Sequence, residues 1–328
     1  MLTKMVAWFL FAGLSCSIYS FIRPPLPAGR AKLRTIIIDP GHGGIDPGTH
    51  GLISKEKDVT LEIGLKLGEA IQKEMPGVKV LYTRTTDLLP GNLDNIHESL
   101  RVRAETANKA KGDLFISIHC DATPQPAGGW YAKRVIGHKS VYKYTGRGSH
   151  RKKRWVKEPI YEAYWVKNTR IGASTYIWAA DRSGSKSSFI GEKNVDGQDS
   201  DFEASQDSSF MPDMNSPEAR MQAELYEKKF FDNSFLLASM VQEQFKNNGR
   251  IDLGVLQRTW AGIWVLQATG MPSILIETGY LTNKEEEEYL NSDKGQADIV
   301  QEIVDALKQY KDSIEGAHSE LSNTPAGS

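Results

Sequence analysis

The sequence has few cysteines, no excess of charge of either sign and no long apolar run. Cys16 and Cys120 are the only cysteines among the 328 residues, so an intramolecular disulfide is not expected and stability must come from the core. The formal net charge is −1, which is not typical of nucleic-acid-binding proteins, and no nucleic-acid partner is expected. What remains is a globular composition, 40% hydrophobic and 25% charged, with enough apolar material for one enzyme-sized core.

The amino terminus has the layout of an export signal. Lys4 precedes the apolar run Met5 to Leu14, and small residues follow at Ser15, Cys16 and Ser17. The run is too short to span a membrane comfortably, and the prolines just after it would break a core helix. Residues 1–29 are therefore assigned to a signal peptide and linker, and the protein is expected to be exported to the periplasm or cell envelope. Two fates stay open, namely plain cleavage and a lipid anchor at Cys16.

Segments typical of strands and helices alternate along the rest of the chain, which predicts a layered α/β domain. Leu33 to Ile38 is a continuous apolar run, as expected for a strand covered on both faces. Apolar residues recur every four positions from Val59 to Ile71 and predict a helix capped by Asp58. Further strands are expected at 78–83, 114–119, 263–267 and 274–277, and further helices at 100–110, 230–245 and 299–310. The polar tail 316–328 is expected to be disordered.

Four residues suited to metal binding or acid–base chemistry lie where apolar segments end or begin. His42 stands in Asp-Pro-Gly-His-Gly-Gly, where the glycines allow a sharp turn that exposes the imidazole. His119 and Glu277 end strand-like segments, and Glu56 lies at a helix start, where the macrodipole favours a carboxylate. Because ligands bind at the carboxyl ends of strands in open α/β sheets, these side chains are expected to converge. Two imidazoles and one carboxylate are a ligand set for catalytic zinc, and a second carboxylate can handle the proton.

Each of these residues also has an ordinary structural interpretation. A lone His in a glycine-rich turn is usually solvated, His119 fits a satisfied core histidine, and Glu56 fits a solvated helix start. Glu277 is harder to dismiss, because the three apolar residues before it should bury it, and a buried carboxylate needs a partner or a purpose. Cys120 should face away from the side of the strand that carries His119 and belong to the core. The other histidines are not assigned to the site: His50, His97, His138, His150 and His318.

The ordered set of motifs resembles the zinc-dependent N-acetylmuramoyl-L-alanine amidases of type 3, a family that includes bacterial cell-separation and autolytic amidases. The resemblance runs from about Arg34 to about Lys311. Besides the site motifs it includes Leu100 to Arg103 with Ala107-Asn108, Gly112 to Phe115, Gly172 to Trp178, and Glu277 to Asn283. It implies a single three-layer catalytic domain over residues 30–315, with a mostly parallel six-stranded sheet flanked by helices. It also implies one Zn²⁺ per chain bound by His42, Glu56 and His119, with Glu277 as the catalytic residue.

The activity that this resemblance implies is hydrolysis of the amide bond between N-acetylmuramic acid and L-alanine in peptidoglycan, for cell wall remodelling or daughter-cell separation. Zinc lowers the pKa of a bound water from about 15.7 toward roughly 7, and Glu277 would take and return the proton. Two alternatives stay open: a zinc peptidase that cleaves within stem peptides, and a non-catalytic wall-binding protein, which would be expected to lack one of the four residues. A monomer is expected. No repeated wall-binding module is visible, so the domain must bind its polymer unaided or through an activator protein.

Two insertions depart from the family pattern. The first, about 124–171, carries the basic run Arg151 to Arg154 among many aromatic residues, and is either a solvated excursion or a contact for an anionic polymer, with aromatic faces stacking on sugars. The second, about 192–227, is acidic with a helix expected from Pro217 to Phe230. It is either a disordered loop or a segment that covers the zinc until an activator displaces it, as in some members of the family. Asp121 follows Cys120 where the family often has Ala-Asn, and its effect on substrate contacts is left open.

Overall fold

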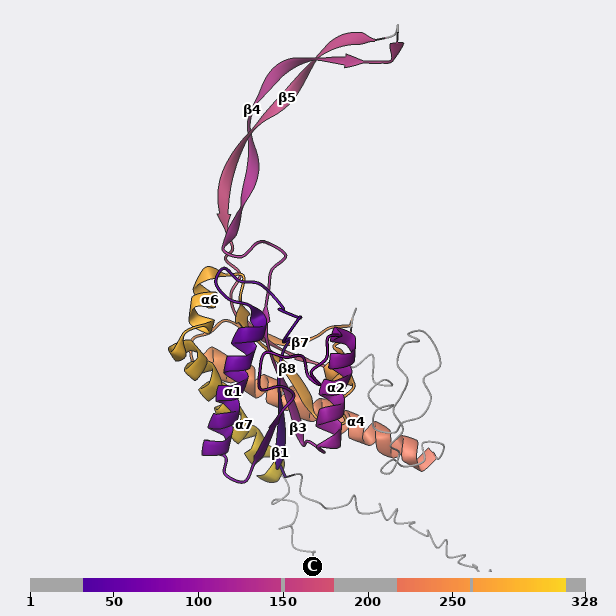
Figure 1. Cartoon of the computed structure of the whole chain (residues 1–328), viewed down its shortest axis with the longest axis vertical. Helices are drawn as coiled ribbons and strands as arrows, with labels where there is room; N and C mark the ends of the chain where they lie inside the picture. Colours follow the sequence, from indigo (N-terminus) through magenta and orange to yellow (C-terminus); the bar gives the residue numbers. More distant parts are fainter. Residues whose placement is uncertain (1–31, 149–150, 180–216, 260–261, 317–328) are drawn as a thin grey trace, which may run out of the picture. The chain divides into compact units, whose positions relative to one another are not determined.

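A computed structural model describes residues 32–148, 151–179, 217–259 and 262–316. The described residues form a six-stranded sheet in the order β2-β1-β3-β8-β6-β7, flanked by helices (Figure 1). Its strands are β1 (Thr35–Pro40), β2 (Lys79–Tyr82), β3 (Leu114–Asp121), β6 (Ala173–Ile177), β7 (Asp252–Gln257) and β8 (Ser273–Tyr280). The first four strands in this order are parallel, whereas β6 runs antiparallel to β8 and parallel to β7. The prediction of a mostly parallel six-stranded sheet in one α/β domain is confirmed.

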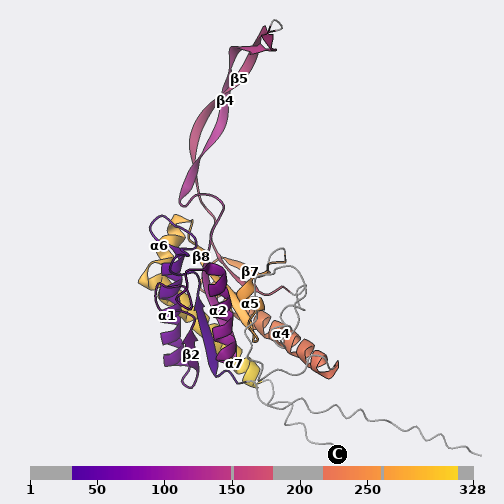
Figure 2. The same ribbon diagram turned by 45° about the vertical axis from the view of Figure 1, so that its right-hand side comes forward.

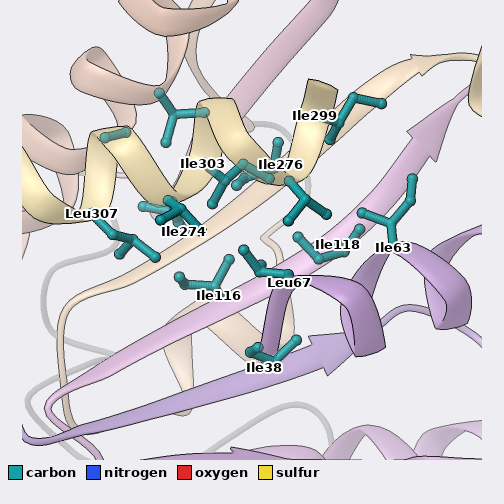
Figure 3. Close-up of a cluster of buried hydrophobic side chains, with 14 of the residues drawn as sticks. Ile38, Ile63, Leu67, Ile116, Ile118, Ile274, Ile276, Ile299, Ile303 and Leu307 are labelled. Carbon is teal, nitrogen blue, oxygen red and sulfur yellow. The ribbon is translucent and has the colours of Figure 1, made fainter. Parts of the chain in front are cut away.

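Helices cover both faces of the sheet (Figure 2). They are α1 (Glu56–Glu74), α2 (Ile96–Lys109), α4 (Pro217–Asn247), α5 (Trp264–Gln267), α6 (Lys284–Leu290) and α7 (Asp293–Gly316). One core cluster joins α1, α4 and α7 to the sheet. In Figure 3, Ile63 and Leu67 of α1 and Ile303 of α7 lie against the isoleucines of the central strands.

The central strands alternate between this cluster and a smaller one on the other face. In β1, Ile36 and Ile38 belong to the larger cluster, whereas Ile37 packs with α2 and α5. The same alternation places Phe115 of β3 and Leu275 of β8 in the smaller cluster. A strand buried on both faces needs apolar residues at successive positions, which explains the continuous runs in the sequence.

Three sequence-based expectations about elements need correction. Lys55, not Asp58, is the residue that precedes α1, and its side chain makes no capping hydrogen bond, so the helix begins three residues earlier than predicted. The apolar segment 263–267 is the short helix α5 rather than a strand. Strand β7 had no predicted counterpart. The helices expected at 217–230 and 230–245 are parts of the one helix α4.

The first insertion contains a long antiparallel ribbon, β4 (Gly129–Thr145) with β5 (Lys152–Lys167), visible in Figure 1. Among the described residues, the two strands pair with each other and with no third strand. Most of their side chains are exposed on both faces. The ribbon therefore has no hydrophobic core of its own.

Several predicted features lie outside the described residues. They are the signal peptide with its linker and Cys16, the tail from 317 onward, and residues 192–216 of the acidic insertion. Within the described part of the chain, no helix is both long enough and apolar enough to cross a membrane.

Candidate metal centre

Three side chains from separate parts of the sequence meet at the carboxyl end of the central strands. Glu56 Oε1 lies 3.0 Å from His42 Nε2 and 2.9 Å from His119 Nδ1. The two imidazole rings meet edge to face, with centroids 4.9 Å apart. One donor atom from each residue lies within 4.8 Å of the others, so the three can hold a metal ion. Two imidazoles and a carboxylate suit zinc, which leaves further coordination positions open.

His42 is held in an unusual backbone conformation. Its φ is +61°, in the left-handed region that few residues other than glycine adopt. Two arginines fix the main chain around it. Arg103 donates to the carbonyls of Pro40 and His42 at 2.9 and 2.5 Å, and Arg84 donates to those of Pro40 and Gly41 at 3.0 and 2.8 Å. These charged donors satisfy the carbonyls of the turn and so support the conformation that presents the imidazole.

The second nitrogen of His42 has a carboxylate partner. Its Nδ1 lies 2.8 Å from Asp46 Oδ2. Metal-binding histidines commonly donate the other ring N–H to a carboxylate, which fixes the tautomer and ring orientation. Asp46 therefore positions His42, and this residue was not predicted from the sequence.

Glycines make room for the close approach of the three side chains. A Cβ added at Gly41 would lie 2.4 Å from His119 Cε1. One added at Gly48 would lie 2.6 Å from Glu56 Oε2 and 2.7 Å from His42 Cδ2. Both positions must remain free of side chains for the cluster to form.

Glu56 enters the cluster from the first residue of α1. Its Oε2 accepts a hydrogen bond from the backbone N–H of Thr49 at 2.8 Å, and its Oε1 accepts one from Cys120 N–H at 3.1 Å. Burial raises the pKa of this carboxyl, but the two histidines lower it more, and the net pKa lies well below its usual value. Burial likewise lowers the pKa of His42, yet its bonds to Asp46 and Glu56 raise it to about 9. The carboxyl of Glu56 is therefore ionised at neutral pH, and the imidazole of His42 favours its protonated form.

Glu277 lies beside this cluster on the neighbouring strand. It is the register partner of His119 between β8 and β3, and its side chain is 9% exposed. Its Oε2 is buried and makes no hydrogen bond within the described residues. Burial, with a further contribution from the charges of Glu56 and Asp121, raises its pKa well above the usual value. A buried carboxyl oxygen without a protein donor beside two imidazoles is suited to receiving a proton from a bound ligand or water.

The cluster opens into a cavity of about 450 Å³. Asp39, Asp121 and Glu277 contribute carboxylates to its lining, and Arg103 and Arg258 contribute positive charge. The remaining wall is mostly apolar, from Leu89, Ile96, Leu100, Ile263, Trp264, Val265 and Leu275. Such a mixture of apolar wall and converging polar groups is typical of a small-molecule or substrate site.

A profile of the family described as N-acetylmuramoyl-L-alanine amidase matches residues 36–309, which is most of the chain. The chain belongs to this family. The matched region contains all four predicted site residues and the whole described sheet except Thr35, the first residue of β1.

Individual relatives and solved structures agree with this assignment. The chain is similar to the N-acetylmuramoyl-L-alanine amidase AmiC of Escherichia coli, with 29% identity over 287 residues, which is 87% of this chain and 55% of AmiC. The chain thus spans about half the length of that relative. Its fold is similar to that of an N-acetylmuramoyl-L-alanine amidase from Clostridium difficile 630, with 24% identity, a TM-score of 0.50, and coverage of 86% of this chain and 98% of that one. It is also similar in fold to the CwlD amidase of Clostridioides difficile, solved in complex with the GerS lipoprotein, with 22% identity, a TM-score of 0.50, and coverage of 84% and 98%.

The family motifs outside the cluster have structural tasks. Arg103, from the Leu100 to Arg103 motif, pairs with buried Asp39 at 2.5 Å while it holds the His42 turn. Asn108 binds the loop before β8 through Ala268 and Gly270, at 2.9 and 2.8 Å. Asn283 accepts from Glu286 N–H at 3.1 Å and caps α6. These residues bind main-chain groups and the Asp39 side chain, and Arg103 binds the metal cluster at the His42 carbonyl.

The two residues that follow His119 in β3, Cys120 and Asp121, have different surroundings. Cys120 is buried in the larger core cluster, as predicted, but it also borders the cavity that His119 lines. Asp121 lines the cavity and accepts a hydrogen bond from Ala122 N–H at 2.7 Å. Of the acidic insertion, residues 217, 221 and 223–227 have described side chains, and none of these lines the cavity. The prediction that this segment covers the metal concerns residues of which most lie outside the described ranges, and it stays a prediction.

Proposed function

We propose that this protein is a zinc-dependent N-acetylmuramoyl-L-alanine amidase, which cleaves the amide bond between N-acetylmuramic acid and the first L-alanine of peptidoglycan stem peptides. The observation that carries the proposal is the His42–Glu56–His119 cluster beside the buried carboxyl of Glu277, in a chain of this family. His42, Glu56 and His119 would hold one Zn²⁺. When bound, the ion supplies Lewis-acid polarisation of the scissile carbonyl and acidifies the attacking water.

The chain's own residues would do the rest of the work. Glu277 would accept the proton of the attacking water and return it to the leaving amine, because its Oε2 is buried and has no hydrogen-bond donor among the described residues. Glu277 would be available as a carboxylate once its neighbour Glu56 held a cation, because the positive charge would oppose the effect of Glu56 on the pKa of Glu277. Asp46, Arg84 and Arg103 would keep His42 oriented through the reaction.

We further propose that the protein acts outside the cytoplasmic membrane, where its substrate lies, after export directed by residues 1–29. The Clostridioides difficile CwlD structure contains a lipoprotein partner, GerS, which supports the idea that an amidase of this fold works with a second protein. We propose a protein partner here as well, and its identity requires a binding screen.

Digestion of purified sacculi tests the reaction. The zinc-loaded protein should release intact stem peptides with a free amino-terminal L-alanine, identified by mass spectrometry, and a chelator should abolish the release. Glu277→Gln should lower the rate at least about a hundredfold, the usual scale of general acid–base catalysis. Glu288→Gln, which changes an exposed carboxyl of α6, is the matched control and should keep the wild-type rate. Fragments cut inside the stem peptide would instead assign a peptidase, and intact murein after zinc loading would refute the proposed hydrolysis.

A further inference from the structure

The β4–β5 ribbon has two chemically different faces. Opposite residues of an antiparallel pair share a face, and a bulge between Val135 and Gly137 shifts the alternation in β4. The register therefore places six aromatic residues on one side, which we call the aromatic face: Tyr131, Tyr142, Tyr144, Trp155, Tyr161 and Trp165. The opposite face carries Tyr164 and Trp130 and is otherwise aliphatic or charged.

The rings of the aromatic face are exposed although they are large. Tyr131 is 73% exposed, Trp155 is 60% exposed and Tyr161 is 57% exposed. Rings from the two strands meet in pairs: Tyr131 contacts Trp165 with centroids 5.1 Å apart, and Tyr142 contacts Trp155 at 3.4 Å. Exposed aromatic rows of this kind mark a binding surface, because their burial by a partner is favourable and their rings are already ordered.

The ribbon is also strongly basic. Residues 129–167 contain eleven Lys and Arg against two Glu, a formal net charge of +9 in a chain whose total is −1. Lys153 Nζ lies 3.7 Å from the centroid of the Tyr142 ring, so positive charge is interleaved with the rings. On the opposite face, by contrast, Arg134 and Lys143 are paired with Glu162 and Glu158 at 2.5 and 2.9 Å. The aromatic face thus carries Lys133, Lys153 and Lys157 and no carboxylate, whereas both glutamates lie on the opposite face, where they offset part of its positive charge.

The ribbon is anchored at the edge of the sheet that carries the metal cluster. Gly128 N–H donates to Thr282 O at 2.9 Å, and Asn283 Nδ2 donates to Asn168 O at 2.9 Å, both in the segment just after β8 and Glu277. Asn168 Nδ2 also donates to Thr123 Oγ1 at 2.7 Å, just after β3 and His119. A polymer bound to the ribbon would thus be held by segments that directly follow the two strands, β3 and β8, from which His119 and Glu277 come.

We propose that the aromatic face binds the glycan strands of peptidoglycan, with rings stacked on sugar faces and lysines paired with stem-peptide carboxylates. This inference rests on the proposed function for the identity of the polymer. Charge complementarity supports it, since a ribbon of net +9 faces an anionic polymer. The row of rings begins at Trp165 and ends at Tyr144, which pairs with Lys153. From residue 165 to residue 153 it covers twelve residues, or about 40 Å of strand, a length that suits a linear ligand lying along the ribbon. A membrane anchor would instead gather its aromatic residues at one depth.

Binding to purified, protein-free sacculi tests the proposal by cosedimentation. Every protein carries Glu277→Gln so that binding is read without digestion. Trp155→Ala with Tyr161→Ala should weaken binding by about tenfold or more, whereas the opposite-face control Tyr164→Ala with Val156→Ala should stay within about twofold. The conservative pair Trp155→Phe with Tyr161→Phe should retain binding, because stacking needs a ring, and this outcome separates stacking from loss of the ribbon's structure.

The charges are tested in the same way. Lys153→Gln with Lys157→Gln, on the aromatic face, should weaken binding more than Lys139→Gln with Lys143→Gln, which removes the same charge from the opposite face. A neutral N-acetylglucosamine oligomer should compete for the ribbon. Four outcomes would overturn the proposal. The first two are equal losses of binding from variants of both faces and no loss of binding from either. The other two are an absence of competition by the oligomer, and tighter binding of the aromatic face to phosphatidylglycerol vesicles or single-stranded DNA than to sacculi. Because hydrolysis is not measured, a protein that binds sacculi through this face but never releases peptides would refute the proposed function alone.

Discussion

At the residue scale, the juxtaposition of the four proposed site residues could be anticipated from the sequence, but most of the residues that position them could not. His42, Glu56, His119 and Glu277 stand out because they end or begin apolar segments, and the structure brings them together. Asp46 binds the imidazole of His42, and Arg84 donates to main-chain carbonyls of the turn before it. Neither contact can be read from a helical or strand periodicity in the sequence. Asp46 lies two residues after the glycine-rich turn, whereas Arg84 lies forty residues after it and has no such signal in the sequence.

Gly41→Ala should disrupt the metal centre while the sheet stays folded. The new methyl group would lie 2.4 Å from His119 Cε1, so the imidazole must move away from Glu56. We expect zinc affinity to fall by about tenfold to a hundredfold, measured by competition with a chromogenic chelator. Gly270→Ala is the control, since its nearest neighbour would be Asn108 Oδ1 at 3.6 Å. Equal zinc affinity in Gly41→Ala and the wild type would show that His119 is not a ligand.

Asp39→Asn should lower stability in a pH-dependent way. Asp39 is buried, and although burial raises its pKa, the Arg103 guanidinium and the hydroxyls of Thr83 and Ser117 lower it below the usual value. A carboxyl whose folded pKa is lowered contributes stability above its unfolded pKa of about 3.9 and loses it as pH falls through the folded value. Urea unfolding should show the variant less stable by about 3 kcal/mol near pH 7, because Arg103 loses a buried partner. A difference that does not shrink under acid conditions would contradict this account.

At the element scale, α6 controls the loop that leads to Glu56. The buried carboxylate of Glu287 accepts backbone N–H bonds from Leu52 at 2.8 Å, Ile53 at 2.8 Å and Ser54 at 2.9 Å. Glu56 follows this loop by two residues. The anchoring carboxylate and the anchored loop are more than 230 positions apart, so no local pattern predicts the contact.

Glu287→Gln should therefore loosen the metal centre from a distance. An amide nitrogen would replace one acceptor oxygen against these donors, which costs about 1–3 kcal/mol. Hydrogen exchange of residues 52–56 should accelerate, and zinc affinity should fall, in comparison with the exposed neighbour variant Glu288→Gln. An unchanged exchange rate in residues 52–56 would contradict the prediction, because the loop would then be held in place without the Glu287 carboxylate.

The sequence predicted long elements better than short or two-faced ones. The central strands and α1, α4 and α7 are clear because their apolar residues follow a run or a helical period. Segment 263–267 was wrongly assigned because five mostly apolar residues fit a buried strand and a buried helical turn equally well. The ribbon was not predicted as strands, because its sequence of charged and aromatic residues shows no alternation of apolar and polar positions. Its strands pair with each other and, within the described part of the chain, do not pack an apolar face on the core.

At the scale of the whole molecule, metal binding should stabilise the fold. The three proposed ligands come from the segment after β1, the start of α1 and the end of β3, so an ion bound to all three links those elements. Free zinc at a hundred times its Kd should raise the free energy of unfolding by about 2.7 kcal/mol, measured by denaturant titration with and without chelator. His119→Ala should abolish this increase, and His97→Ala, which changes an exposed residue, should preserve it. A similar increase in both variants would place the ion elsewhere.

The position of β8 in the sheet sets when the protein can become active. This strand is the last of the sheet to be synthesised, yet it lies between β3 and β6 and carries Glu277. A ribosome-bound or truncated chain that ends before residue 273 has all three proposed ligands but neither the carboxyl beside them nor a continuous sheet. Incomplete chains should therefore be harmless to the cell that makes them. The proposed hydrolytic activity should arise only after nearly the entire polypeptide has left the ribosome and β8 has paired between β3 and β6.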